Sequence, residues 1–284
     1  MITQKEIIEI AEQKRLQTKI IDKDWVLGHF LNAMYSFDDV RQNFVFKGGT
    51  ALKKCYFPDY RFSEDLDFTL LDKDFVVNDS FIKEIIKIAT LQSRIQFYFQ
   101  KQKLQKSEDE EQGYEIKIKY WGADHKPNQQ PLPPSRWQTA IKLDISFSEK
   151  LVTKPLVKPI IHEYSDKESI TYTITVYTLQ EVMGEKIRSL IQRNRPRDIY
   201  DIAYLSNHIT EESYPIVKEI LTAKAKDKNI LISGVKDFVN PKKGRSNKRA
   251  WQSSLGEHLP VGKLPDFDEV YSNTEHFIKK ILNS

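Results

Sequence analysis

The spacing of hydrophobic and polar positions predicts a mixed α/β region over the first half of the chain. Apolar residues three or four positions apart indicate helices within residues 4–35 and over 79–89. Short strands that alternate apolar with polar positions are predicted at 44–47, 65–70, 95–100, 114–120 and 137–148. A short helix is expected near 50–56, a polar connecting loop at 101–113 and a proline-rich loop at 124–134. This mixture predicts a mixed sheet covered by helices.

From about residue 178 the pattern is helical to the last residue. Thr178 and Glu181 have the spacing of a capping box at the start of a helix over 179–193. Further helices are predicted to start at Pro196 and to cover 211–225 and 267–282. We therefore expect an α/β (α+β) fold with two domains, 1–177 and 178–284, the second a helical bundle.

The strand predicted at 65–70 carries two aspartates on one face. Residues two apart in a strand project to the same side, so Asp65 and Asp67 bring their carboxylates together while Leu66 faces the core. A divalent cation offsets the repulsion of two such charges, and oxygen ligands favour Mg²⁺ or Mn²⁺. A solvent-facing strand edge is the alternative. Asp144 also faces away from the apolar side of its strand, so it is either a third carboxylate of this site or an exposed strand residue.

A pair of glycines separates the strand at 44–47 from the helix that follows it. Gly48 and Gly49 would let a phosphate approach the backbone at the helix N-terminus, although two glycines also form ordinary turns. Thr50 could bind a phosphate or cap the helix, and Lys53 could neutralise phosphate charge or be solvated. Two further lysines of this stretch are expected to be solvated, Lys47 and Lys54.

Lys186 lies within the apolar stripe of the helix over 179–193. A lysine in that position either extends its ammonium group to solvent or points it at a buried anion, and we favour an anion such as a triphosphate. On the next helix Asp198 falls among apolar residues, and Asp201 lies at the edge of that stripe. Asp198 could favour the helix dipole, pair with Lys186 and orient it, or do both.

Composition narrows the class of protein only moderately. Hydrophobic residues make up 39% and charged residues 30% of the 284 residues, which is typical of soluble globular proteins, and no apolar run is long enough to span a membrane. The lone cysteine, Cys55, cannot form a disulfide within the chain, and we expect a cytoplasmic location. No histidine has the spacing of a metal site or a catalytic triad, so zinc hydrolase and serine hydrolase functions have no support.

The net charge of +4 permits a nucleic-acid partner. Residues 242–249 are basic and turn-rich, and with Trp251 they could grip an RNA backbone and stack a base. A solvated loop is the preferred interpretation of this segment, because charged runs in turn-rich sequence usually face solvent.

Four segments of the chain resemble, in order, the motifs of the AbiEii/AbiGii toxin family, which are nucleotidyltransferase-like proteins of the DNA polymerase β superfamily. The segments are Lys47-Gly-Gly-Thr-Ala-Leu-Lys53, Arg61-Phe-Ser-Glu-Asp-Leu-Asp67, Glu185-Lys186 and Arg197-Asp-Ile-Tyr-Asp201. The resemblance implies a nucleotidyltransferase sheet followed by a C-terminal helical bundle. It also implies the toxin of a bacterial toxin–antitoxin or phage-defence pair, with an antitoxin encoded nearby.

The resemblance also implies roles for residues of this chain. Gly49 and Thr50 would hold phosphates of a nucleoside triphosphate (NTP), Lys186 would bind the triphosphate, and Asp65 and Asp67 would bind Mg²⁺. The residue pattern itself adds Gly48, Lys53 and Ser63 as candidates at the nucleotide and Asp144 as a candidate third carboxylate. Asp198 would support catalysis. Four further residues could assist: Arg61, Glu185, Arg197 and Asp201.

The expected activity is Mg²⁺-dependent transfer of a nucleoside monophosphate from an NTP to an acceptor hydroxyl, with RNA such as a tRNA 3′ end as the acceptor. Two alternatives remain at this point. One is a catalytically degenerate protein that binds a nucleotide or RNA. The other is transfer to a protein or small-molecule hydroxyl.

Overall fold

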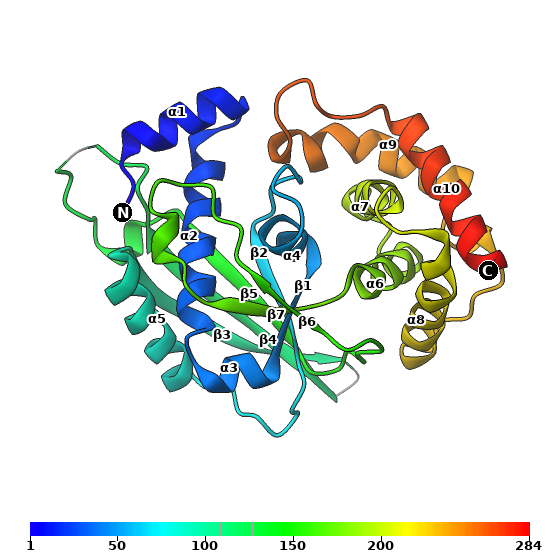
Figure 1. Ribbon diagram of the computed structural model, residues 1–284, viewed down its shortest axis with the longest axis horizontal. Coiled ribbons are helices and arrows are strands. Elements are labelled where there is room, and N and C mark those ends of the chain that lie inside the picture. Colours follow the sequence, from blue (N-terminus) through cyan, green and yellow to red (C-terminus); the bar gives the residue numbers. More distant parts are fainter. Residues whose placement is uncertain (108–109, 127) are drawn as a thin grey trace. The chain divides into compact units, whose positions relative to one another are not determined.

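The computed structural model describes residues 1–107, 110–126 and 128–284, and these form two compact units (Figure 1). The first unit contains residues 1–148 and 155–176, and the second contains 149–154 and 177–284. Glu108, Asp109 and Pro127 lie outside the described residues, so the loops predicted at 101–113 and 124–134 are only partly described.

A mixed sheet is the frame of the first unit. Its seven strands follow the order β3-β4-β5-β2-β1-β7-β6. Neighbouring strands are antiparallel except in two pairs, β2 with β5 and β1 with β7. The bounds are β1 (Phe44–Lys47), β2 (Asp65–Leu70), β3 (Gln96–Ser107), β4 (Glu110–Trp121), β5 (Ala140–Ser146), β6 (Leu156–Pro159) and β7 (Thr173–Val176). The predicted mixed sheet with flanking helices is confirmed.

Helices cover the apolar face of this sheet. They are α1 (Gln4–Lys14), α2 (Thr18–Met34), α3 (Asp38–Asn43), α4 (Gly48–Cys55) and α5 (Asp79–Ser93). From α2, Phe30 packs on Phe97 of β3, and Tyr35, just after the helix, packs on Phe68 of β2, with ring centroids 5.5 and 6.5 Å apart. Burying such a side chain contributes about 1.5–3 kcal/mol relative to exposure. One face of the sheet therefore forms the core and leaves the other for polar side chains.

The loop predicted at 101–113 is wrong over its described part, because residues 101–107 and 110–113 extend β3 and β4. Backbone pairing satisfies the peptide groups of β3 that face β4 whatever the side chains are, and lysines suit a strand at the edge of a sheet. The sequence also gave no expectation for β6 or β7. Both are four residues long, and β6 leaves Leu156 and Val157 exposed at the other edge, so their pattern is uninformative.

The second unit is helical, as predicted. It contains α6 (Leu179–Gln192), α7 (Pro196–Ser206), α8 (Tyr214–Asp227), α9 (Pro241–Leu255) and α10 (Phe267–Asn283). Thr178 accepts a hydrogen bond from the backbone N–H of Glu181 at 3.0 Å and so caps α6. Gly184 brings α6 against α8, since a Cβ at this position would lie 2.5 Å from Ile220 Cγ2. Close packing of these two helices organises the unit.

The basic segment 242–249 lies within helix α9, so the predicted loop is wrong. Asn240 accepts hydrogen bonds from the first backbone N–H groups of the helix, and Pro241 occupies its first position, where no N–H is needed. Trp251 is 5% exposed and donates from its ring nitrogen to the Pro265 carbonyl at 2.9 Å, so it is unsuited to stacking a base. The helix still exposes a basic row, made of Lys242, Arg245, Lys248 and Arg249.

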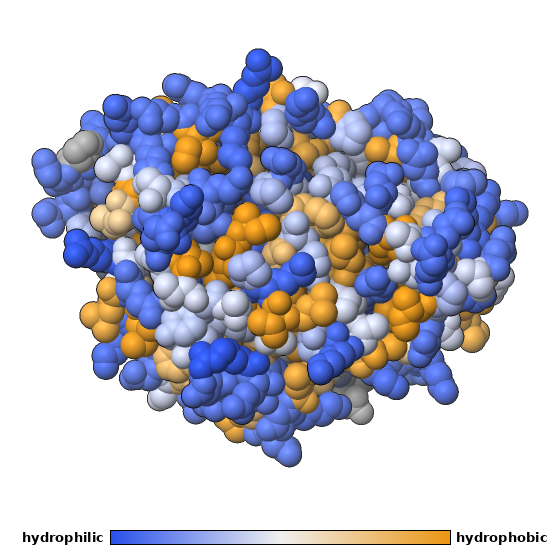
Figure 2. Space-filling view, in the orientation of Figure 1, coloured by the Kyte–Doolittle hydropathy of each residue, from blue (hydrophilic) through white to orange (hydrophobic). Residues whose placement is uncertain are grey.

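The surface is largely polar. Figure 2 shows hydrophilic residues over most of the face turned to the viewer, with hydrophobic residues in small separate patches. Exposed apolar side chains such as Leu231 and Val261 are ordinary for a globular surface, and Leu156 and Val157 are two adjacent examples on the edge strand β6. Within the described ranges, none of the helices combines the length and apolar character needed to cross a membrane.

Candidate functional site

The register of three neighbouring strands places carboxylates on one face of the sheet. Asp67 on β2 lies opposite Asp144 on β5 and opposite Lys47 on β1. Directly opposed residues share a face, and residues two apart on a strand do as well, so Asp65 joins this group. Leu66 projects to the other face and is fully buried. Asp65, Asp67 and Asp144 therefore line one polar face of the sheet.

The glycine turn lies directly against this group. Gly48 starts α4 with a φ of 80°, a conformation that residues with a Cβ rarely adopt. A Cβ at Gly48 would lie 2.3 Å from a carboxylate oxygen of Asp67, so only glycine lets the turn and the strand approach this closely. The backbone N–H groups at the start of α4 and the carboxylate of Asp67 thus belong to one site.

A cation and a hydroxyl lie beside the second glycine. A Cβ at Gly49 would be 2.7 Å from a guanidinium nitrogen of Arg61 and 3.2 Å from the hydroxyl oxygen of Ser63. Arg61 is buried, and its guanidinium group lies over the ring of Tyr60 and donates to the Phe62 carbonyl at 3.3 Å. These contacts hold a positive charge and a hydrogen-bonding group at the turn, where an anion would be favoured.

Thr50 and Lys53 have defined contacts within the first unit. The hydroxyl of Thr50 is buried and donates to the backbone carbonyl of Asp65, which joins α4 to β2. The ammonium group of Lys53 donates to the Pro58 carbonyl and lies 4.4 Å from the centre of the Phe62 ring. Burial lowers the pKa of Lys53. Both residues therefore support the α4–β2 connection, and their roles toward a phosphate stay predictions.

The expectation that Lys47 and Lys54 are solvated is wrong, because both are buried. Lys54 is 1% exposed and pairs with Asp24 of α2 at 2.7 Å. Burial alone would raise the pKa of Asp24, but Lys54 and Lys53 outweigh it and lower that pKa. The partner of Lys54 lies 30 positions away, so local periodicity could not reveal it.

The carboxylates of Asp65 and Asp67 supply oxygen donors on one face of the sheet. Burial raises the pKa of Asp65 against the opposing effects of Lys23 and Lys142, and Asp144 and Glu64 add to the increase. Carboxylate oxygens are the ligands that Mg²⁺ prefers. The residues present therefore fit a divalent cation at Asp65 and Asp67.

Asp144 already has partners. Lys142 lies 2.8 Å from one of its carboxylate oxygens, and Gln105 donates to the other at 3.3 Å. Lys142 also pairs with Glu115 at 3.3 Å. Any role of Asp144 toward a cation or an acceptor hydroxyl requires these contacts to rearrange, and that role stays a prediction.

Asp65→Asn is expected to stabilise the protein at neutral pH when divalent cations are absent. A carboxyl whose pKa is raised by folding destabilises the folded state once the pH exceeds that raised pKa. The gain in unfolding free energy should therefore be smallest near pH 4 and should increase toward pH 7. Urea unfolding across this range measures it, with exposed Asp59→Asn as the control. A variant less stable than the wild type at pH 7 would contradict the burial argument.

Lys186 in the second unit lies between two buried aspartates. Its ammonium nitrogen is 3.0 Å from Asp198 and 2.8 Å from Asp201, and Arg193 makes two further contacts with Asp198, at 2.8 and 2.9 Å. Burial alone would raise the pKa of Asp198, but Lys186 and Arg193 lower it overall. The predicted Lys186–Asp198 pair is present, and the buried anion that Lys186 faces includes Asp201.

Glu185 and Arg197 have contacts within the second unit that give them structural roles. Glu185 lies 3.4 Å from the ammonium nitrogen of Lys224 on α8. Arg197 donates to the Ser254 carbonyl at 3.1 Å and lies 2.7 Å from a ring nitrogen of His258. These contacts join α7 to the end of α9, while the supporting roles of both residues at a nucleotide stay predictions.

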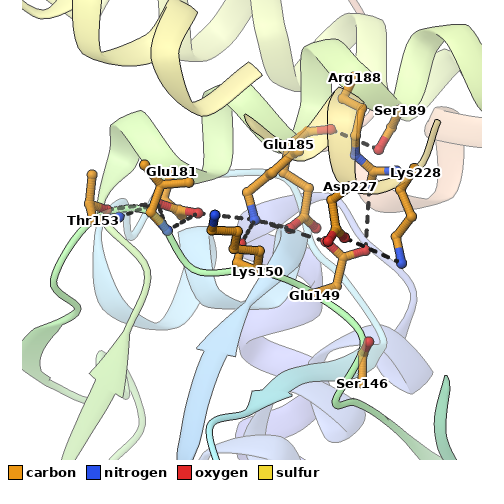
Figure 3. A network of polar contacts seen from close by, with 12 residues as sticks. Ser146, Glu149, Lys150, Thr153, Glu181, Glu185, Arg188, Ser189, Asp227 and Lys228 are labelled. Atoms are coloured by element: carbon orange, nitrogen blue, oxygen red, sulfur yellow. Dashed lines mark hydrogen bonds and ion pairs between the residues drawn. The ribbon is translucent and has the colours of Figure 1, made fainter. Parts of the chain in front are cut away.

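Lys224 is the centre of a polar network that the sequence did not reveal. It is 1% exposed, and its ammonium nitrogen lies 3.0 Å from Glu181, 3.4 Å from Glu185 and 3.9 Å from Glu149. Figure 3 shows these three carboxylates gathered in one network. Glu181 also accepts hydrogen bonds from Thr153 at 2.8 Å. The network ties segment 149–154 to α6 and α8.

Comparison with known proteins finds similarity in family and in fold. The family model described as nucleotidyl transferase AbiEii toxin, type IV TA system, matches residues 29–273. MenT4, a nucleotidyltransferase toxin from Mycobacterium tuberculosis H37Rv, has a similar structure, with a TM-score of 0.68 and 16% identity over 100% of this chain and 91% of that one. JHP933 from Helicobacter pylori has a TM-score of 0.57 and 18% identity over 94% of each chain. No curated protein sequence matches significantly.

Proposed function

Because this chain belongs to the AbiEii family of nucleotidyltransferase toxins of type IV toxin–antitoxin systems, we propose that it transfers a nucleoside monophosphate from an NTP to a hydroxyl group of RNA, such as a tRNA 3′ end. The observation that carries the proposal is the contact between the Gly48 turn and Asp67, on the sheet face that also bears Asp65 and Asp144. This contact joins a phosphate-binding feature to a cation-binding one.

Each part of the site has a role in binding the triphosphate. The backbone N–H groups at Gly48 and Gly49 begin α4 and would bind phosphate oxygens, with Arg61 adding positive charge beside them. The resemblance of the Glu185-Lys186 segment to a family motif supports Lys186 as a further ligand of the triphosphate. Asp198 holds its ammonium group in place through the contact described above.

Asp65 and Asp67 would hold Mg²⁺, which would neutralise phosphate charge when bound. Asp144 is assigned to accept the proton of the acceptor hydroxyl. The hydroxyl oxygen then bonds to the α-phosphorus while the bond to the β-phosphate oxygen breaks, and pyrophosphate leaves. This chemistry depends mainly on positioning and charge neutralisation, which the rigid sheet and turn provide.

Two features support the proposed partners. The basic row of α9, from Lys242 to Arg249, is exposed, and such a row attracts the phosphate backbone of RNA. Family membership implies an antitoxin as the second component of the system.

The test is label transfer by the purified protein. With Mg²⁺ and each α-labelled NTP in turn, we expect label on total tRNA, release of pyrophosphate, and loss of both in Asp65→Ala. Equal labelling by wild type and Asp65→Ala would overturn the assignment of the site. If the wild type binds a nucleotide without releasing pyrophosphate, and Asp67→Ala still binds that nucleotide, the protein is a binding protein and not an enzyme. Label on protein lysate or on an aminoglycoside, in place of tRNA, would identify a different acceptor.

A further inference from the structure

Two histidines and an aspartate from distant parts of the chain meet in the first unit. His29 lies on α2, and His162 and Asp166 lie in the segment that follows β6. One ring nitrogen of each histidine faces Asp166, at 3.1 Å for His29 and 3.2 Å for His162. His29 and Asp166 are 137 positions apart, so the local spacing of histidines does not indicate this cluster.

The three side chains are held firmly in this arrangement. His29 and His162 are 4% and 7% exposed, and their rings meet edge to face with centroids 4.9 Å apart. Trp25, one turn before His29 on α2, donates from its ring nitrogen to the Asp166 carboxylate at 3.1 and 3.2 Å. Gly28 leaves the space that His162 fills, since a Cβ there would lie 2.3 Å from its ring.

The geometry is that of a set of metal ligands. One ring nitrogen from each histidine and one carboxylate oxygen of Asp166 all lie within 4.8 Å of one another. A tetrahedral zinc ion with bonds of about 2.1 Å places its donor atoms about 3.4 Å apart. His29 Nε2 lies 3.1 Å from one carboxylate oxygen of Asp166 and His162 Nε2 lies 3.2 Å from the other, and both distances are close to that spacing.

We propose that His29, His162 and Asp166 form a zinc site, with three protein ligands and a fourth position open to water. Imidazole nitrogen with a carboxylate oxygen favours zinc over magnesium, so this site differs in chemistry from the all-oxygen group at Asp65 and Asp67. The proposal does not depend on the proposed enzymatic function, because it rests on other residues.

A bound zinc ion would stabilise the packing of α2 and of the segment that follows β6, near the helix that begins at the glycine turn. It would tie the segment that follows β6 to α2. The same segment is joined to α4, because the backbone N–H of Ile161 donates to the Lys54 carbonyl at 2.7 Å. α4 is the helix that begins at Gly48. Bound zinc would therefore act as a structural link next to the helix that presents the turn.

The test is zinc binding by the full chain after removal of metals with a chelator. In millimolar Mg²⁺, which occupies all-oxygen sites, titration calorimetry should give one zinc per chain, and zinc should raise the melting temperature. His162→Gln and His29→Gln should each weaken zinc binding at least a hundredfold. Two control variants should bind zinc with the affinity of the wild type. One is His208→Gln, at an exposed histidine in the turn that follows α7, and the other is Asp67→Asn.

Three results would overturn the proposal. The first is no stoichiometric zinc, which would leave the cluster a hydrogen-bonded network only. The second is equal zinc affinity in the wild type and in both histidine variants, each checked for native circular dichroism. The third is loss of zinc binding in Asp67→Asn, which would place the ion at the sheet carboxylates. If His162→Gln does not fold, His29→Gln gives the same comparison.

Discussion

Asp67→Asn is expected to lower nucleotidyl transfer by about 10²–10³-fold, the usual cost of removing one group that stabilises charge in a transition state. Asparagine has nearly the same shape as aspartate, so it keeps the contact with Gly48 that excludes any Cβ there. It lacks the negative charge that a phosphate-bound cation requires. The rate of label transfer from NTP to RNA at saturating substrate measures the effect.

The matched control for this prediction is Asp74→Asn, an exposed aspartate shortly after β2. It changes the net charge of the protein by the same amount and should leave transfer unchanged. The melting temperature of Asp67→Asn, measured beside that of the wild type, separates a loss of transfer from a loss of folding. If Asp67→Asn transfers label at the wild-type rate, Asp67 has no part in the reaction.

Lys224→Met is expected to destabilise the protein by about 3–5 kcal/mol, the range for removing one partner of a buried ion pair. The ammonium group lies among Glu149, Glu181 and Glu185, and methionine would leave these carboxylates without their shared cation. Chemical denaturation followed by circular dichroism measures the loss.

Lys226→Met provides the comparison, because Lys226 lies on the same helix and is exposed. It should change stability by no more than about 0.5 kcal/mol. In a double-mutant cycle, Glu181→Gln should cost less in the Lys224→Met background than in the wild type, since its partner is already gone. A loss below 1 kcal/mol for Lys224→Met would show that the network does not stabilise the fold.

The central strands could be predicted from the sequence because their two faces differ. On β2, Leu66 and Phe68 are buried while Asp65 and Asp67 are partly exposed, which gives a clean alternation. β6 has four residues and little burial, so it carries no such pattern. The composition of helix α9 does not predict a helix, because lysines and arginines mixed with glycine and serine are typical of an exposed loop, although Asn240 and Pro241 are a helix-starting pair.

The residue pairs of the two units also differ in whether the sequence could predict them. The shared face of Asp65 and Asp67 follows from a period of two, and the Lys186–Asp198 pair follows from two neighbouring amphipathic helices. The Asp24–Lys54 pair and the histidine cluster join residues that are far apart in the chain. Local periodicity holds no information on such pairs, so only the folded chain reveals them.

The chain passes from the first unit to the second and back before residue 177, which limits how the protein can be cut into separately folding fragments. Segment 149–154 belongs to the second unit although residues on both sides of it belong to the first. A fragment that stops at residue 176 would carry Glu149 and Thr153 away from Lys224 and Glu181, and the remaining helices would lack both. A split-gene or domain-exchange experiment would therefore have to graft this hexapeptide onto the helical half.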